Sequence, residues 1–208
     1  MENRTGGRAR LGSAIFALAL AALAAVPAPA QQAEFKLDPA KSSVKFTLDA
    51  ALHTVHGTFQ IKPGALQFDP VSGQISGEIL VDARSGASGS GMRDRKMHKD
   101  VLESETYPDI SFRPSRVEGA VAHQGKSAVK VTGMFRIHGV DREITVPAEV
   151  ELLPESWTAM AHFTIPYAKW GMKNPSTLFL RVNDSVEIDL AASGTVAERS
   201  TTPRDSAQ

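Results

Sequence analysis

The feature of this sequence that most restricts its fold is the alternation of apolar and polar side chains. From Val129 to Ile137, apolar residues or glycine occupy every second position, and mostly polar residues fall between them. The same pattern returns from Ile144 to Leu152, from Trp157 to Ile165 and from Val186 to Ala192. Because successive side chains of a strand point to opposite faces, each segment predicts a strand with one apolar face.

A sheet with one apolar face must close on itself or pack on a second sheet. The segments are short and are bounded by Gly, Pro, Asp and Asn, a spacing typical of β-sandwiches and β-barrels. Gly139-Val140-Asp141 is predicted to connect two strands as a hairpin, which makes them antiparallel neighbours. We therefore predict an all-β protein, an antiparallel β-barrel of about eight strands. The charges on its outer face, such as Lys130 and Glu149, favour a barrel in water over one in a bilayer.

The stretch from Gly91 to Phe112 departs from the alternation and predicts one short helix. A helical period places three apolar side chains on one side, namely Met97, Val101 and Leu102. Ser90 is a candidate N-cap, and Tyr107-Pro108 is predicted to end the helix because proline lacks a backbone donor. The helix either only covers the sheet, or its basic residues also face the anionic head group of a ligand.

The two ends of the chain differ from the rest. Residues 1–30 are predicted to be a secretory signal peptide, with a basic start, an apolar run from Leu11 to Val26 and a cleavage site at Ala28-Pro29-Ala30. The run is shorter than the roughly 20 residues that cross a bilayer, so no stable membrane span and a periplasmic or secreted protein are expected. A retained anchor is the alternative. Residues 197–208 are polar and aperiodic and predict a disordered tail, which leaves a domain of residues 31–196.

Composition excludes several classes of function. The 23 basic residues balance the 23 acidic ones, which argues against a nucleic-acid partner. The absence of cysteine excludes a disulfide framework and a thiolate metal site. No serine lies in a G-x-S-x-G elbow and no motif pairs two carboxylates, so we predict no catalytic residues. His53 and His56 would point to opposite faces of a strand, so we predict no metal site there.

The predicted inward face decides between a packed core and a ligand cavity, because an eight-stranded barrel is near the size that can hold one small ligand. Aromatic residues on this face are mixed with small ones, namely Ala50, Gly77, Gly133, Ala148, Ala159, Ala161 and Ala192. Either the small residues leave room for a long hydrocarbon ligand, or the glycines make bends and the alanines meet bulky partners in a packed core. The sequence leaves both interpretations open.

Five groups of residues, in order along the domain, resemble the YceI-like family of bacterial polyisoprenoid-binding proteins. They are D-P-A-K-S-S-V-K-F (Asp38 to Phe46), G-T-F (Gly57 to Phe59), R-D-R-K-M-H-K-D (Arg93 to Asp100) with Y-P-D-I-S-F (Tyr107 to Phe112), G-M-F-R-I-H-G-V-D-R-E-I-T-V-P (Gly133 to Pro147), and V-E-I-D-L (Val186 to Leu190) with Gly194.

The resemblance implies an exported, lipocalin-like barrel that holds a polyisoprenoid chain, as a polyprenyl pyrophosphate or an isoprenoid quinone. It implies no catalysis, and the bound lipid takes the place of a cofactor. The residues expected to line the ligand tunnel are Phe46, Leu48, Phe59, Phe112, Phe135, Trp157 and Phe163. Arg93, Arg95 and Lys96 are expected near an anionic head group. Trp170 lies in a segment without alternation, where it either anchors a long connection by hydrophobic contact or lies at the ligand entrance.

Two further hypotheses stay open. One is a structural or interaction module with a filled core, and the other is a periplasmic metal-binding protein. The sequence also leaves open whether the protein forms a homodimer.

Overall fold

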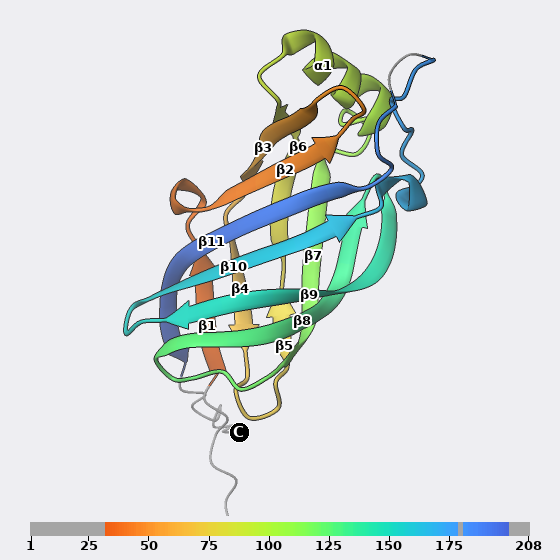
Figure 1. The fold of residues 1–208 in the computed structure, drawn as a ribbon. Coiled ribbons are helices and arrows are strands. Elements are labelled where there is room, and N and C mark those ends of the chain that lie inside the picture. The colour runs from red at the N-terminus through yellow and green to blue at the C-terminus, as the bar shows by residue number, and fades with distance from the viewer. Residues whose placement is uncertain (1–31, 179–180, 200–208) are drawn as a thin grey trace, which may run out of the picture.

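Residues 32–178 and 181–199 are described by a computed structural model, in which strands dominate and one helical segment interrupts them (Figure 1). The strands are β1 (Gln32–Leu37), β2 (Ser43–Asp49), β3 (Thr54–Ile61), β4 (Gly64–Phe68), β5 (Ile75–Gly77), β6 (Ile79–Ala87), β7 (Asp109–Glu118), β8 (Gly125–Ile137), β9 (Val140–Leu152), β10 (Ser156–Ile165) and β11 (Val186–Arg199). The helical segment is α1 (Gly91–Lys96), which continues as a π-helix, η2 (Met97–Val101). Two short 3-10 turns are η1 (Pro39–Lys41) and η3 (Tyr167–Trp170).

Eight of these strands form a closed ring. Their order is β10-β9-β8-β7-β6-β3-β2-β11, and pairing of β10 with β11 closes it. Each neighbouring pair is antiparallel. The predicted fold class, an antiparallel barrel of about eight strands with one short helix, is confirmed.

The long strand β11 joins the ring to three further strands. Its first part, Glu187–Ala191, pairs with β2, and its second part, Gly194–Arg199, pairs with β1. β1 in turn pairs with β4, and β4 with β5. A bridge between Gln74 and Arg116 links this group back to β7. These strands lie at the end of the barrel where β1 begins (Figure 1).

The predicted tail begins too early. Ala197, Glu198 and Arg199 belong to β11, with Ala197 opposite Glu34 of β1. Their polar composition predicted disorder, but an edge of β1 supplies the backbone partners that composition does not reveal. The rest of that tail, residues 200–208, and the predicted signal peptide of residues 1–30 lie outside the described residues.

The hairpin between β8 and β9 turns one residue earlier than predicted. Ile137 pairs with Val140, and the turn consists of His138 and Gly139 with φ angles of 53° and 74°. Two positive φ angles in a two-residue loop match the primed turn whose twist suits antiparallel strands. His138 consequently leaves the outer strand face on which the alternation placed it, and its ring stacks on Tyr107 at 4.4 Å between centroids.

The helical segment begins as predicted and ends sooner. Gly91 follows Ser90 at the start, although the Ser90 side chain makes no capping hydrogen bond. The segment ends at Val101, well before Pro108, because Glu103 adopts a left-handed φ of 46°. This turn lets the Ser104 N–H donate to the carbonyl of His98 at 3.0 Å, which closes the helix without proline.

Candidate functional site

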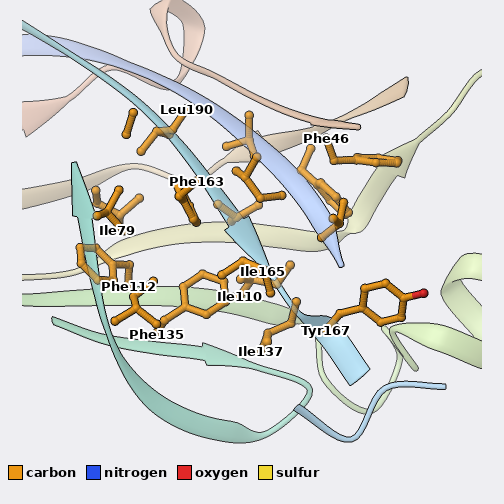
Figure 2. Close-up of a pocket in the computed structure, with 18 of the residues that line it drawn as sticks. Phe46, Ile79, Ile110, Phe112, Phe135, Ile137, Phe163, Ile165, Tyr167 and Leu190 are labelled. Atoms are coloured by element: carbon orange, nitrogen blue, oxygen red, sulfur yellow. The ribbon is translucent and has the colours of Figure 1, made fainter. Parts of the chain in front are cut away.

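An apolar cavity of about 590 Å³ runs through the barrel, and all eleven strands contribute to its wall. The inward positions of each strand supply aliphatic and aromatic side chains, as the alternation requires. Figure 2 shows Phe46 on one side of this space and Phe112 and Phe135 on the facing side. A cavity of this size and lining suits an apolar ligand better than a polar one.

All seven of the predicted tunnel residues line the cavity, and they do so from five different strands. These are Phe46, Leu48, Phe59, Phe112, Phe135, Trp157 and Phe163. The alternation along each strand was sufficient to place them, because every second side chain of a strand points to the same face of the sheet. Their contact with a ligand stays a prediction.

Small residues on the predicted inner face divide into two groups. Five alanines line the cavity: Ala50, Ala148, Ala159, Ala161 and Ala192. The two glycines do not. A Cβ on Gly133 would lie 2.4 Å from the carbonyl oxygen of Arg113, and Gly77 has a φ of 108°. The glycines therefore permit close strand contact and a bend, and the alanines leave the space.

Two other glycines let aromatic rings lie flat against the wall. A Cβ on Gly57 would lie 2.3 Å from the Phe46 ring, and one on Gly86 would lie 2.5 Å from the Phe59 ring. The two rings meet at 5.4 Å between centroids. Residues without side chains on β3 and β6 thus set the positions of two predicted tunnel residues.

The far end of the cavity, near the chain termini, is filled by aromatic rings. Phe35 packs edge-on against Trp157 at 5.7 Å and lies 6.5 Å from Phe68. The Trp157 indole also donates to the carbonyl of Lys36 at 3.3 Å. These contacts close the barrel at this end.

The opposite end of the cavity is its mouth. It is surrounded by α1 and η2, by the β2–β3 turn at residues 50–53, and by residues 171–178 and 181–185. The polar residues that line the cavity gather mainly here: His53, Ser88, Ser90, Arg93, Lys96 and Thr177. An elongated ligand would therefore lie with its apolar part inside the barrel and a polar end at the mouth.

Arg93 and Lys96 line the mouth, whereas Arg95 does not. Residues three apart share a face of a helix, and Arg95 falls on the opposite face, where it is exposed. Arg93 is held by Ser88, to whose hydroxyl it donates from Nε at 2.7 Å and to whose carbonyl it donates from Nη2 at 2.8 Å. The Ser88 hydroxyl donates to Asp94, and this hydrogen bond is the main cause that lowers the pKa of Asp94. Ser88 therefore holds the ionised carboxylate of Asp94 beside the guanidinium of Arg93.

Trp170 does not line the cavity. It is 4% exposed, packs edge-on behind Phe135 at 5.9 Å, and lies under the guanidinium of Arg142 at 5.4 Å. The sequence left open whether it anchors the connection or lies at the entrance, because its segment lacks the alternation that assigns a side chain to a face; its burial agrees with the anchor. The structure places it in the outer layer of the wall, on η3.

Tyr167 is a wall residue that the sequence did not single out. It lines the cavity, is buried, and its hydroxyl donates to the carbonyl of Asn183 at 2.5 Å. Burial, and to a lesser extent the nearby Asp184 carboxylate, raise the pKa of Tyr167 to about 12. This hydrogen bond ties residues 181–185 to the barrel at the mouth.

We expect Tyr167→Phe to lower the free energy of unfolding by about 1 kcal/mol, the usual net value of one buried hydrogen bond. The neutral phenol is favoured in the folded state, so its contribution is present below pH 10 and lost as pH rises toward 12. Urea unfolding at neutral and alkaline pH measures both effects. The variant should lose less stability than the parent between these values, and an equal loss would contradict the assignment.

The metal-binding hypothesis gains no support from residues 32–178 and 181–199, where no three His, Asp or Glu side chains gather. His98 instead bridges the helix and β6, within 2.8 Å of the Gly86 carbonyl and 3.1 Å of the Ser104 hydroxyl. In the same residues, no helix is long and apolar enough to cross a bilayer.

Comparisons with known proteins agree with this architecture. A UPF0312 protein of Vibrio parahaemolyticus is 28% identical over 140 residues, which cover 65% of this chain and 72% of that protein. BcnA of Burkholderia cenocepacia has a crystal structure with a TM-score of 0.63 and 24% identity, over 76% of this chain and 99% of that one. A polyisoprenoid-binding domain from Saccharophagus degradans, implicated in plant cell wall breakdown, has a TM-score of 0.61 and 17% identity, over 78% of this chain and 98% of that one.

The family model of the YceI-like domain matches residues 35–193, which include seven strands of the ring in full and the first part of β11. This match covers most of the chain, and the barrel matches solved structures over nearly their full length. The predicted family is confirmed, and the chain belongs to the YceI-like family.

Proposed function

We propose that this chain is an exported, non-enzymatic protein that binds a polyisoprenoid chain inside its barrel, as a polyprenyl pyrophosphate or an isoprenoid quinone. The observation that carries the proposal is the cavity of about 590 Å³, which is apolar along its length and polar mainly at its mouth. A filled core does not fit a cavity of this size. The description of the related domain from Saccharophagus degradans as polyisoprenoid-binding supports the same ligand class.

The energy of binding favours a long hydrocarbon. Burial of each methylene contributes about 0.8 kcal/mol, so several isoprene units exceed the roughly 4–15 kcal/mol that association costs. The wall contributes shape and apolar contact from Phe46, Phe112, Phe135 and Phe163, and it offers few groups that could hold a polar ligand.

The head group of the ligand is proposed to lie at the mouth. Arg93 and Lys96 are the charged residues among those that line the cavity, and both are basic. The guanidinium of Arg93 is oriented by Ser88, which favours recognition of a phosphate at a fixed place. A pyrophosphate head would meet both cations, whereas a quinone ring would accept a single hydrogen bond.

Export and the absence of catalysis belong to the same proposal. The features of residues 1–30 indicate a secretory signal, and a protein that carries an isoprenoid lipid is of use near the membranes of the periplasm. In the described residues the wall presents no carboxylate, so no acid-base pair faces a bound chain.

Native mass spectrometry of the mature protein, purified from the periplasm of its own cells, tests the proposal. We expect a bound species that, after organic extraction, belongs to a series with five-carbon mass increments and a phosphate or quinone head. A protein that is empty, and that also fails to take up added polyprenyl pyrophosphate and quinone, would refute the proposal.

A further inference from the structure

Three elements around the mouth each expose one large apolar side chain. Leu52 in the β2–β3 turn is 79% exposed, Met92 in α1 is 77% exposed, and Leu178 at the end of residues 171–178 is 97% exposed. Each lies in the lining of the cavity or beside it. Met92 itself lines the cavity, Leu52 lies between Ala50 and His53, and Leu178 follows Thr177. We call these three residues the apolar rim.

Two of these elements are joined to one another. The Ala51 N–H donates to the carbonyl of Arg181 at 2.8 Å, and the Asn183 N–H donates to the carbonyl of Asp49 at 2.9 Å. Ala50 and Val182 also form a β-bridge. The third element, α1, lies at the same end of the barrel (Figure 1). The apolar rim is therefore carried by one end of the molecule, although its residues are far apart in the sequence.

The charges that line the mouth are complementary to an anionic surface. Arg93 and Lys96 line the mouth, and no Asp or Glu does so in residues 32–178 and 181–199. Arg95 and Lys99 are exposed on the same helical segment. Exposed apolar side chains flanked by lysine and arginine are the composition that binds the interface of an anionic bilayer.

Other exposed apolar residues do not cluster in this way. Val71 follows β4 in the turn to β5, Leu153 lies between β9 and β10, and Met160 is on β10. None of the three lines the cavity. Single apolar residues on a surface are ordinary, whereas a set that surrounds the opening of an apolar cavity indicates a contact surface.

We propose that the mouth docks on an anionic phospholipid bilayer, with the apolar rim inserted among the head groups and Lys96 at the mouth beside the lipid phosphates. The proposal rests on the function proposed above, and it supplies the route that a long apolar ligand needs. A chain that passes from the bilayer directly into the docked barrel avoids exposure of its methylenes to water.

Flotation of the empty, mature protein with vesicles tests docking. The vesicles contain phosphatidylcholine with or without phosphatidylglycerol, and they contain no isoprenoid. We expect the protein to float with the anionic vesicles, and to do so less at high salt because salt screens the basic residues. The variant Leu52→Ser/Met92→Gln/Leu178→Ser should reduce the bound fraction roughly tenfold, as loss of inserted apolar area predicts.

The matched control is Val71→Ser/Leu153→Ser, which removes two exposed apolar side chains away from the mouth and should leave flotation unchanged. Docking is refuted if the parent protein does not float, or if the control loses as much binding as the rim variant. It is also refuted if light scattering shows a dimer that the rim variant abolishes, since a second copy would then cover the rim.

A separate measurement keeps docking apart from ligand binding. Polyprenyl phosphate is added from ethanol without vesicles, and the lipid that the protein retains is extracted and quantified by mass spectrometry. Normal retention by a protein that does not float would refute docking alone. Flotation of a protein that retains no lipid would refute the carrier function and leave the bilayer contact standing.

Discussion

Ala161→Trp is expected to reduce the lipid that copurifies with the protein at least about tenfold, while the barrel stays folded. Ala161 lies on β10, lines the cavity, and pairs with Ala148 and Leu190 across the neighbouring strands. An indole at this position occupies space that the proposed ligand would fill. Displacement of only two methylenes of a bound chain costs about 1.6 kcal/mol, which exceeds a tenfold change in affinity.

The control for this variant is the adjacent residue. Met160 is 61% exposed on the other face of β10, so Met160→Trp adds the same indole outside the barrel. Lipid extraction with quantitative mass spectrometry compares the two variants, and thermal unfolding shows whether each is folded. Ala161→Leu should give an intermediate loss. Full retention of lipid by a folded Ala161→Trp protein would show that the ligand does not lie in this part of the cavity.

Gly194→Ala is expected to have the largest effect on stability, a loss of about 3 kcal/mol or more in the free energy of unfolding. Gly194 pairs with Leu37 of β1 and with Trp157 of β10. A Cβ at Gly194 would lie 1.7 Å from the carbonyl oxygen of Lys36 and 2.9 Å from the indole nitrogen of Trp157. Because the nearer atom belongs to the backbone, a change of rotamer cannot relieve the clash, and β1 must separate from β11.

Gly91→Ala provides the comparison for the same chemical change. The nearest atom to its added Cβ is the Arg95 side chain at 3.6 Å, an ordinary contact, and alanine favours a helix over glycine. Equilibrium urea unfolding should show a lower midpoint for Gly194→Ala and an unchanged or slightly higher one for Gly91→Ala. A difference below about 0.5 kcal/mol between the free energies of unfolding of Gly194→Ala and the parent would mean that the pairing of β1 with β11 accommodates the added methyl group at little cost.

Predictions from the sequence succeeded where a strand is long and its neighbours are regular. In β8, the alternation from Val129 to Ile137 fixed which residues face inward, and Phe135 lines the cavity as a result. The same argument placed Phe163 and Trp157 on β10. The period of two is a property of backbone geometry, and tertiary contacts alter it little within a strand.

Predictions failed where the chain leaves a regular strand. His138 continues the alternation in the sequence, but two positive φ angles turn the chain there. The end of the helix was assigned to Pro108, whereas the left-handed Glu103 ends it first. Trp170 lies on a 3-10 turn, where the position of a side chain depends on long-range contacts with Phe135 and Arg142. Local pattern contains no information on these contacts.

The glycines of the wall show a further limit. Gly133 and Gly77 were assigned to the inner face because they continue an apolar pattern, yet neither lines the cavity. A glycine has no side chain, so its position on a face does not reveal whether it leaves space or lets another strand approach. Only the distance from Gly133 to the carbonyl of Arg113 distinguishes these two roles.

The pairing of β11 determines when the molecule can become a barrel. This strand is the last among the described residues, and it is hydrogen-bonded to β1, β2 and β10. During synthesis the earlier strands can form hairpins, such as β8 with β9, but the ring cannot close until β11 has left the ribosome. Such a chain stays open for most of its synthesis, and closure is a late, nearly single event. The export proposed above would gain from this delay, because a polypeptide passes through a translocation channel unfolded.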